Sequence, residues 1–330
     1  MNNITVLGTG SWGTALAFTA AQKALAVTIW GRNPATAEEI NTRHVNSRYL
    51  PASLPPNLRA TTDLSCVNGA EAILFVVPSC SMRSVAESAA AAGISPQSIL
   101  VSATKGIERN TGLRMTGILH QVFPRNPVAV ISGPNHAEEI TQQLAAAAVI
   151  GSVDRDCAVR LQQFFTLPWF RTYTSDDIIG IEWGGAVKNI FAIASGITEG
   201  LGLGDNARAA LVTRGLAEMT RLGMAAGGRF ETFQGLSGVG DLIVTCYSRH
   251  SRNNRVGRGL GQGQTLQEVT KSMNMIAEGV PNTDSIHMAA RKYGVRTPII
   301  DQIFAILYEN KPCAAALAEL LSRDPRPESE

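Results

Sequence analysis

Three glycines near the N-terminus constrain the fold of this 330-residue chain more than any other feature. Gly8, Gly10 and Gly13 form a Gly-x-Gly-x-x-Gly motif between an apolar run, residues 4–7, and an alanine-rich run typical of a helix, residues 11–22. In such a strand–turn–helix unit the first glycine permits a tight turn, the second lets a pyrophosphate approach the backbone, and the third allows close helix packing. The motif predicts a dinucleotide-binding βαβ unit rather than an incidental glycine turn.

The first half of the chain continues this alternation of short apolar runs with helix-like runs. We expect strands at residues 4–7, 26–30, 72–77, 99–103, 128–132 and 146–151, with helices at 11–22, 35–46 and 82–92. Continuous apolar strands separated by helices are typical of a parallel sheet that is buried on both faces. The pattern predicts an α/β domain of Rossmann type.

The pattern changes near residue 180, after which only helices and glycine-rich joints are expected. Helices are predicted at 189–198, 207–222, 266–273, 283–292 and 301–308, and joints at 199–204 and 257–263. Asp205 precedes the longest of these helices, where an N-cap residue belongs. We therefore predict a Rossmann-type domain at 1–180, an all-helical domain at 181–322, and a charged, proline-bearing tail at 323–330 that is disordered.

Composition excludes several classes of protein. The formal net charge of +2 is too small for a chain that wraps nucleic acid. The five cysteines show no Cys-x-x-Cys pairing, which favours free thiols in a reducing cytosol and gives no sign of a metal site. The sequence shows neither a signal peptide nor an uncharged run long enough to span a bilayer. We expect a cytoplasmic protein with a small-molecule substrate.

The end of the second predicted strand bears on the choice of dinucleotide. An acidic residue there would bond a ribose 2′-hydroxyl, but this chain has Arg32, with no carboxylate beside it. A guanidinium can pair with a 2′-phosphate, which favours NADP(H), with NAD(H) as a tolerated alternative. A solvated surface arginine is the other interpretation of Arg32.

Two lysines are candidates for the chemistry. Lys105 follows the fourth predicted strand, and ligands of open α/β sheets bind beyond the carboxyl ends of strands, although an exposed loop lysine is the alternative. Lys188 lies in the apolar run 184–197, where a charge must be paired or used. Burial would lower its pKa towards the range useful for proton transfer, whereas a snorkelling surface lysine would keep its charge in water.

Polar residues between 241 and 253 form a second group of candidates. Asp241 and Thr245 share one face if their segment is helical, although a post-glycine aspartate can be only an N-cap. Ser251, Arg252 and Asn253 offer a hydroxyl, a guanidinium and an amide to a phosphate, or else form a solvated loop. His136 follows the fifth predicted strand and is a candidate acid–base residue, although a loop histidine satisfied by local hydrogen bonds is the favoured interpretation.

Together these stretches resemble the bacterial NAD(P)-dependent glycerol-3-phosphate dehydrogenase family. The matching motifs lie at 8–17, 49–51, 103–108, 132–134, 185–189, 200–206, 213–219, 240–246, 251–253 and 277–280, which extends over nearly the whole chain. The resemblance implies reversible, NAD(P)H-dependent reduction of dihydroxyacetone phosphate to sn-glycerol 3-phosphate. It also implies a homodimer that supplies glycerophospholipid synthesis.

The resemblance implies a role for each matching residue. Lys188 would be the acid–base group, Lys105 a second cation at the substrate, and Asp241 the residue that orients Lys188. The substrate-binding residues would be Lys105, Gly133, Asn135, Asn189, Asp241, Thr245, Ser251, Arg252 and Asn253. The cofactor-binding residues would be Gly8, Gly10, Ser11, Trp12, Gly13, Arg32, Tyr49, Lys105, Ala137, Arg252, Ile276 and Glu278.

One departure from the family pattern follows the fifth predicted strand. The family usually has Ser-Phe after Ser-Gly-Pro, where this chain has Asn135 and His136. Asn135 can still form hydrogen bonds, but His136 replaces an aromatic wall, and its role is left open. Two rival interpretations are a dehydrogenase of the same architecture for another hydroxy acid or phosphorylated acid, and a non-enzymatic NADP-binding sensor.

Overall fold

The computed structural model describes residues 1–271, 273, 276–325 and 327–328. Its first part is built on an eight-stranded sheet with the order β3-β2-β1-β4-β5-β6-β7-β8. The strands are β1 (Asn3–Leu7), β2 (Ala26–Trp30), β3 (Leu58–Thr61), β4 (Ala72–Phe75), β5 (Ile99–Ser102), β6 (Val128–Ser132), β7 (Ala146–Gly151) and β8 (Phe170–Ser175). Neighbouring strands from β3 to β6 are parallel, so their carboxyl ends meet at one edge of the sheet.

The sheet departs from the sequence prediction in three respects. β7 pairs antiparallel to β6, because the short connection through α5 (Ala137–Thr141) reverses the chain direction. β3 and β8 were not expected. Both are sheet edges that mix polar and apolar residues, as in Leu-Arg-Ala-Thr, and a strand exposed on one side lacks the continuous apolar run of a buried strand.

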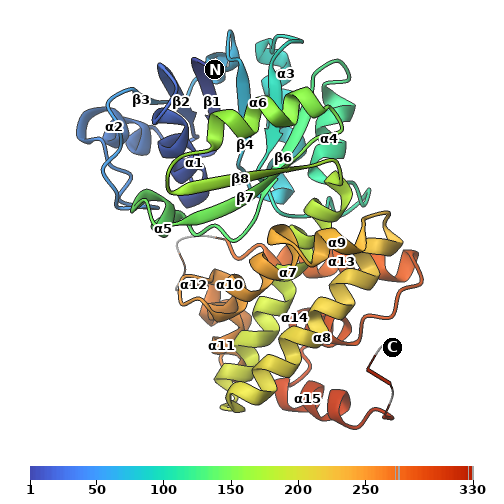
Figure 1. The fold of residues 1–330 in the computed structure, drawn as a ribbon. Helices are drawn as coiled ribbons and strands as arrows, with labels where there is room; N and C mark the ends of the chain where they lie inside the picture. Colours follow the sequence, from blue (N-terminus) through green and yellow to red (C-terminus); the bar gives the residue numbers. More distant parts are fainter. Residues whose placement is uncertain (272, 274–275, 326, 329–330) are drawn as a thin grey trace.

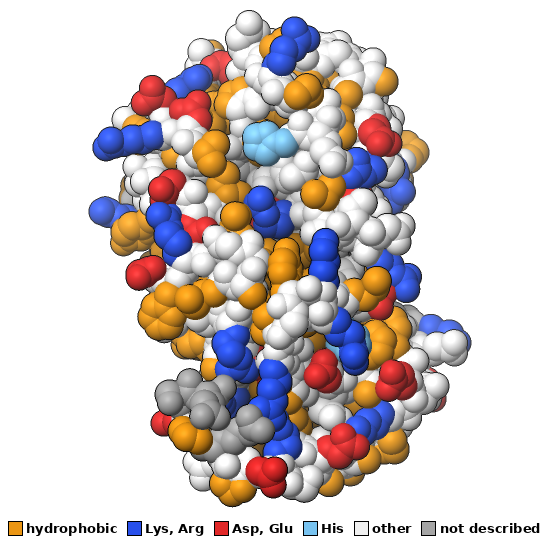
Figure 2. Space-filling view, turned by 90° about the vertical axis from the view of Figure 1, so that its right-hand side faces the viewer, with side chains coloured by type: hydrophobic (Ala, Val, Ile, Leu, Met, Phe, Trp, Pro, Cys, Tyr) orange, Lys and Arg blue, Asp and Glu red, His pale blue; other side chains and the backbone are white. Residues whose placement is uncertain are grey.

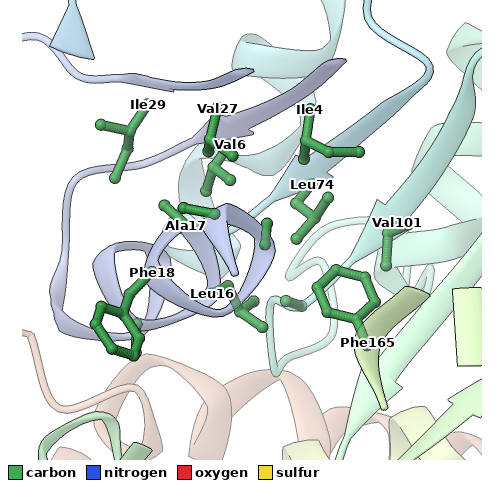
Figure 3. Close-up of a cluster of buried hydrophobic side chains, with 14 of the residues drawn as sticks. Ile4, Val6, Leu16, Ala17, Phe18, Val27, Ile29, Leu74, Val101 and Phe165 are labelled. Atoms are coloured by element: carbon green, nitrogen blue, oxygen red, sulfur yellow. The ribbon is translucent and has the colours of Figure 1, made fainter. Parts of the chain in front are cut away.

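Helices cover both faces of the sheet (Figure 1). They are α1 (Ser11–Ala21), α2 (Pro34–Arg43), α3 (Met82–Ala92), α4 (Met115–Val122), α5 and α6 (Arg155–Phe165), with short 3₁₀ turns at η1 (Leu64–Val67) and η2 (Ser79–Ser81). Ile4 and Val6 of β1 point to the face that packs on α1 and α6, whereas Leu7 points to the face that packs on α3 and α4. Figure 3 shows the first of these cores, with Leu16 of α1 and Phe165 of α6 beneath the strands.

The remainder of the described chain is helical and lies below the sheet domain in Figure 1. Its elements are α7 (Ile178–Gly200), α8 (Gly204–Ala225), α9 (Phe230–Phe233), a π-helical turn η3 (Leu236–Gly240), α10 (Asp241–Tyr247), α11 (Arg252–Gly261), α12 (Leu266–Lys271), α13 (Gly279–Lys292), α14 (Pro298–Tyr308) and α15 (Cys313–Leu321). α7 is the centre of this domain, because nearly every one of its residues is buried. It is longer than the predicted helix 189–198.

Two details of the helical prediction are wrong. Residues 257–261 belong to α11 and do not form a joint, because their glycines serve close helix packing: a Cβ on Gly257 would overlap the carbonyl oxygen of Ile193 in α7. Asp205 lies inside the first turn of α8, whose N-cap position is held by Leu203. The predicted helix 266–273 and the predicted disorder at 323–330 fall partly on residues outside the described ranges.

Charge is mixed on the face of the molecule shown in Figure 2, where Lys and Arg side chains lie among Asp and Glu. Within the described ranges, no helix combines the length and the apolar character needed to cross a membrane. In the same part of the chain, no group of three or more His, Cys, Asp or Glu side chains is arranged to hold a metal ion.

We predict that Gly257→Ala lowers the stability of the protein by about 1–3 kcal/mol, because the added methyl group overpacks the α7–α11 contact. The measurement is the urea-unfolding midpoint followed by circular dichroism. Gly117→Ala in α4 is the matched control, since its Cβ would lie an ordinary 3.5 Å from Leu113 Cδ2. There the usual gain of about 0.5–1 kcal/mol for alanine over glycine in a helix is expected. A Gly257→Ala midpoint equal to that of the parent would contradict the packing argument.

Candidate functional site

The glycine loop between β1 and α1 has the shape that a dinucleotide pyrophosphate requires. Gly8 has a φ of +129°, and a Cβ there would overlap the carbonyl oxygen of Val76. A Cβ on Gly13 would overlap the carbonyl oxygen of Gly8, whereas a Cβ on Gly10 would meet nothing within 4 Å. Gly10 also holds the N-cap of α1 without a side-chain cap, so the helix N-terminus offers backbone N–H groups to an anion. The residues present therefore fit a bound dinucleotide.

Three hydrogen bonds with distant residues hold this loop. Asn46 Nδ2 donates to Thr9 O at 2.9 Å and to Thr14 Oγ1 at 2.8 Å, and Ser11 Oγ donates to Tyr49 O at 2.8 Å. The sequence placed Asn46 at the end of a helix, but α2 ends at Arg43, and Asn46 is a buried residue of the following loop. No spacing in the sequence links Asn46 to the glycine loop, so only the fold identifies this role.

Arg32 lies just beyond β2 and is exposed. Its neighbour Asn33 caps α2 by accepting a hydrogen bond from the N–H of Ala35 at 2.9 Å, which fixes the turn that presents the guanidinium. Exposure is compatible with both interpretations of Arg32, a partner for a 2′-phosphate and a solvated arginine. The choice between NADP(H) and NAD(H) stays a prediction.

The two candidate lysines meet at one buried carboxylate. Asp241, which is 1% exposed, forms an ion pair through Oδ2 with Lys105 Nζ at 2.5 Å. Its Oδ1 accepts a hydrogen bond from Lys188 Nζ, which also donates to Thr245 Oγ1 at 2.7 Å. These residues come from the loop after β5, from α7 and from α10, so the cluster joins the two domains.

This geometry decides several alternatives that the sequence left open. Lys188 is 6% exposed, so it is not a snorkelling surface lysine. Asp241 is the first residue of α10, and its carboxylate pairs with lysines, while Gly240 holds the N-cap position. Asp241 and Thr245 share a helix face as predicted, with Thr245 Oγ1 donating to Asp241 O at 2.6 Å. Lys105 also donates to Gly133 O at 3.3 Å, which connects the cluster to the loop after β6.

The electrostatics of this cluster favour proton exchange near neutrality. Burial lowers the pKa of Lys188 to about 7, because removing an ammonium group from water outweighs the opposing effect of the Asp241 carboxylate. Lys105 lowers that pKa further by charge repulsion. Burial would raise the pKa of Asp241, but the positive charges of Lys105 and Lys188 prevail and hold it below its usual value. The arrangement keeps a carboxylate ionised beside an amine that can hold or release a proton.

The start of α11 places the other candidate residues beside α7 and α13. Asn253 Nδ2 donates to Asn189 Oδ1, and Asn253 Oδ1 accepts from the N–H of Gly279, both at 2.9 Å. Arg252 Nη1 donates to Ile276 O at 2.9 Å, and Ser251 caps α11 by accepting from the N–H of Asn254. The segment is a helix N-terminus and not a solvated loop, although Arg249 and His250 before it are exposed.

The sequence did not predict a second set of hydrogen bonds between the domains, which includes the backbone of Lys105. Ser79 Oγ in η2 donates to Glu278 Oε2 at 2.7 Å, and Asn282 Nδ2 donates to Lys105 O at 3.0 Å. Burial raises the pKa of Glu278, which the Ser79 hydrogen bond partly offsets. For Ser79, the only signal in the sequence was its position directly after Pro78, where the third predicted strand ends. Residues at such strand ends face the ligand-binding edge of the sheet.

The chain combines a glycine loop on a sheet with a buried lysine–carboxylate cluster where the sheet meets a helical domain. These are the parts of a two-domain dehydrogenase that uses a nicotinamide dinucleotide. Two family models match the chain: the N-terminal domain of NAD-dependent glycerol-3-phosphate dehydrogenase at residues 3–158, and the C-terminal domain at residues 177–318. The chain belongs to this NAD-dependent glycerol-3-phosphate dehydrogenase family, and it is accordingly an oxidoreductase.

The similarity to individual proteins extends over nearly the full length of the chain. The glycerol-3-phosphate dehydrogenases [NAD(P)+] of Chlorobium phaeobacteroides and Enterococcus faecalis are 44% and 45% identical to the chain, and each match covers at least 97% of both sequences. The crystal structure of glycerol-3-phosphate dehydrogenase from Coxiella burnetii is 40% identical with a TM-score of 0.94, covering 98% of this chain and 99% of that one. A ketopantoate reductase from Ralstonia eutropha shares only the fold, at 17% identity and a TM-score of 0.63.

We predict that Asp241→Asn destabilises the protein by about 1.4 kcal/mol at pH 6 through Lys188, because the buried ammonium loses its counter-charge and has to give up its proton one pH unit below its pKa of about 7. The loss shrinks above pH 7, where the pKa of about 7 leaves the parental Lys188 mostly unprotonated. The measurement is the unfolding midpoint across this pH range. A second substitution, Lys188→Met, is expected to recover part of the loss. A destabilisation independent of pH and not rescued would contradict the charge argument.

Proposed function

We propose that the chain catalyses the reversible reduction of dihydroxyacetone phosphate to sn-glycerol 3-phosphate, with Lys188 as the acid–base residue. The observation that carries the proposal is the contact of the buried Lys188 amine with the Asp241 carboxylate and the Thr245 hydroxyl. A bound nicotinamide dinucleotide supplies the hydride that C2 receives. Family membership supports the assignment, since full-length relatives carry this activity in their names.

The surroundings of Lys188 suit both directions of the reaction. In reduction, the Lys188 ammonium gives a proton to the oxygen at C2 as the carbonyl becomes an alcohol. In oxidation, the free amine takes that proton back. A pKa near 7 allows both states to be populated at neutral pH. Asp241 and Thr245 accept hydrogen bonds from Nζ and thereby fix the direction of its remaining proton.

Lys105 supplies a second positive charge in the same place. It shares the Asp241 carboxylate with Lys188 and lies at the carboxyl end of β5, so it can contact both the substrate and the nicotinamide end of the cofactor. A fixed cation beside the forming alkoxide stabilises the transition state, and removing one such donor typically costs about 3–4 kcal/mol. Lys105 and Lys188 therefore have distinct tasks, polarisation and proton transfer.

The substrate phosphate is assigned to the N-terminus of α11. Ser251, Arg252 and Asn253 lie there, and the helix N-terminus adds N–H groups that favour an anion. Gly133, Asn135 and Asn189 complete the proposed substrate contacts. Asn189 supports this assignment through its hydrogen bond to Asn253, which ties the substrate-binding face of α7 to α11.

The cofactor assignment extends from the glycine loop to α13. Gly8, Gly10 and Gly13 would hold the pyrophosphate, with further contacts from Ser11, Trp12, Arg32, Tyr49, Lys105, Ala137, Arg252, Ile276 and Glu278. The hydrogen bond of Arg252 to Ile276 supports a joint role for these two residues. Arg32 favours NADP(H) over NAD(H). We further propose a cytoplasmic homodimer that supplies sn-glycerol 3-phosphate to glycerophospholipid synthesis, and the proposed substrate pair requires neither nucleic acid nor a membrane.

We predict that Lys188→Met lowers kcat for dihydroxyacetone phosphate reduction by about 10²–10⁴-fold, the usual effect of losing a general acid. The assay is steady-state oxidation of NADPH, and NADPH binding measured by fluorescence is expected to stay unchanged. Lys292→Met removes an exposed lysine of α13 and serves as the control. If turnover of the Lys188 variant stays within a few-fold of the parent, Lys188 is not the acid, and a non-catalytic role for the cluster gains support.

We predict that Arg32→Ala raises KM for NADPH by about 10-fold or more and leaves KM for NADH within about two-fold, because only NADPH carries a 2′-phosphate for the guanidinium. The measurement compares the two cofactors at saturating dihydroxyacetone phosphate. Arg43→Ala, an exposed arginine at the end of α2, is the control for a general loss of positive charge. Equal losses for both cofactors would refute the 2′-phosphate role.

A further inference from the structure

The loop after β6 contains two buried polar atoms that lack hydrogen-bond partners. They are Asn135 Oδ1 and His136 Nε2, on adjacent residues. Buried polar atoms in folded proteins are nearly always paired, and an unpaired one opposes the burial of its group. Ser102 Oγ and Ser132 Oγ, at the carboxyl ends of β5 and β6, are also buried without partners. Unsatisfied polar atoms thus gather at the ligand edge of the sheet.

His136 lies where the two domains meet. Its ring packs against the ring of His250, with centroids 5.7 Å apart and a tilt of 53°. His250 is exposed and immediately precedes Ser251 and Arg252, at the start of α11. The His136 ring therefore bridges the loop after β6 and the segment to which we assign the substrate phosphate.

The charged and titratable groups that face His136 come from several elements. Lys188 of α7 and His250 disfavour a positive charge on the ring, whereas Glu138 and Glu139 of α5 favour one. Burial is the largest influence, and together these effects lower the pKa of His136. The free protein therefore holds a neutral imidazole at neutral pH, with one N–H to donate.

We propose that His136 binds the phosphate group of the substrate through Nε2 and is thereby a specificity residue of this chain. The inference rests on the proposed function, because it takes a phosphorylated three-carbon substrate as the ligand. A neutral imidazole donates one hydrogen bond to a phosphate oxygen. The dianion also offsets the repulsion from Lys188, so the ring can accept a second proton in the complex.

The proposal also assigns the partner that the buried nitrogen lacks. His250 and the start of α11 belong to the helical domain, and His136 belongs to the sheet domain, so a phosphate bound at α11 lies at the boundary that His136 faces. A phenylalanine at position 136 would keep an aromatic ring there but leave the phosphate one donor fewer. His136 thus distinguishes phosphorylated from unphosphorylated substrates.

The test compares His136→Phe and His136→Gln with the parent, using dihydroxyacetone phosphate and unphosphorylated dihydroxyacetone as alternative acceptors. For His136→Phe we expect kcat/KM with dihydroxyacetone phosphate to fall about 10-fold or more, through KM, since a hydrogen bond to a charged group is lost. With dihydroxyacetone, kcat/KM should change less than two-fold. His136→Gln, whose amide can donate a hydrogen bond, should recover part of the loss. His120→Phe, an exposed histidine of α4, is the control.

The possible outcomes separate this inference from the proposed function. If the parent does not reduce dihydroxyacetone phosphate, the proposed function fails. If the parent is active and His136→Phe keeps the parental KM, only the role of His136 fails. Equal losses with both acceptors would assign His136 to structure and overturn phosphate binding. A rise in KM for NADPH, with KM for dihydroxyacetone phosphate unchanged, would assign the ring to the dinucleotide and also overturn the proposal.

Discussion

The site depends on one buried carboxylate that forms ion pairs with two lysines. Asp241 meets Lys105 from the sheet domain and Lys188 from the centre of the helical domain. Two ammonium groups this close would repel each other, and burial would penalise both. The carboxylate makes their approach tolerable, yet burial still lowers the pKa of Lys188 to about 7. The same cluster therefore serves both as a structural ion pair and as a proton donor near neutral pH.

The position of Asp241 in turn depends on how closely helices approach α7. Glycines at Gly196 and Gly257 allow α11 to lie against the backbone of α7, since a Cβ at either position would overlap a carbonyl oxygen. Gly184 lets the η3 turn approach on another side, with a Cβ there only 2.5 Å from Ser237 O. Because η3 leads directly into α10, this contact fixes the start of the helix that carries Asp241.

The sequence predicted those parts of the fold that local patterns encode. The glycine motif, the buried strands and the helical second half follow from periodicity and turn chemistry. The edge strands β3 and β8 were not predicted, because a strand that is exposed on one side lacks a continuous apolar run. The glycines of α11 were interpreted as a joint, because the sequence does not show which helix they pack against. In the site, spacing indicated Asp241 with Thr245, whereas Asn46 and Asn282 act across the fold and carry no local signal, and Ser79 was marked only by the strand end before it.

The two domains are held in register by a second buried carboxylate, Glu182 near the start of α7. Its Oε1 accepts the N–H of Thr116 at 2.8 Å, and its Oε2 pairs with Arg114 at 2.5 Å, so it caps α4 of the sheet domain. Lys188 follows six residues later on the same rigid helix, and a Cβ at the intervening Gly185 would come within 3.1 Å of Ser132 Oγ at the end of β6. Because α7 is anchored at Glu182 and passes the strand ends so closely, the sheet itself sets where the Lys188 amine lies.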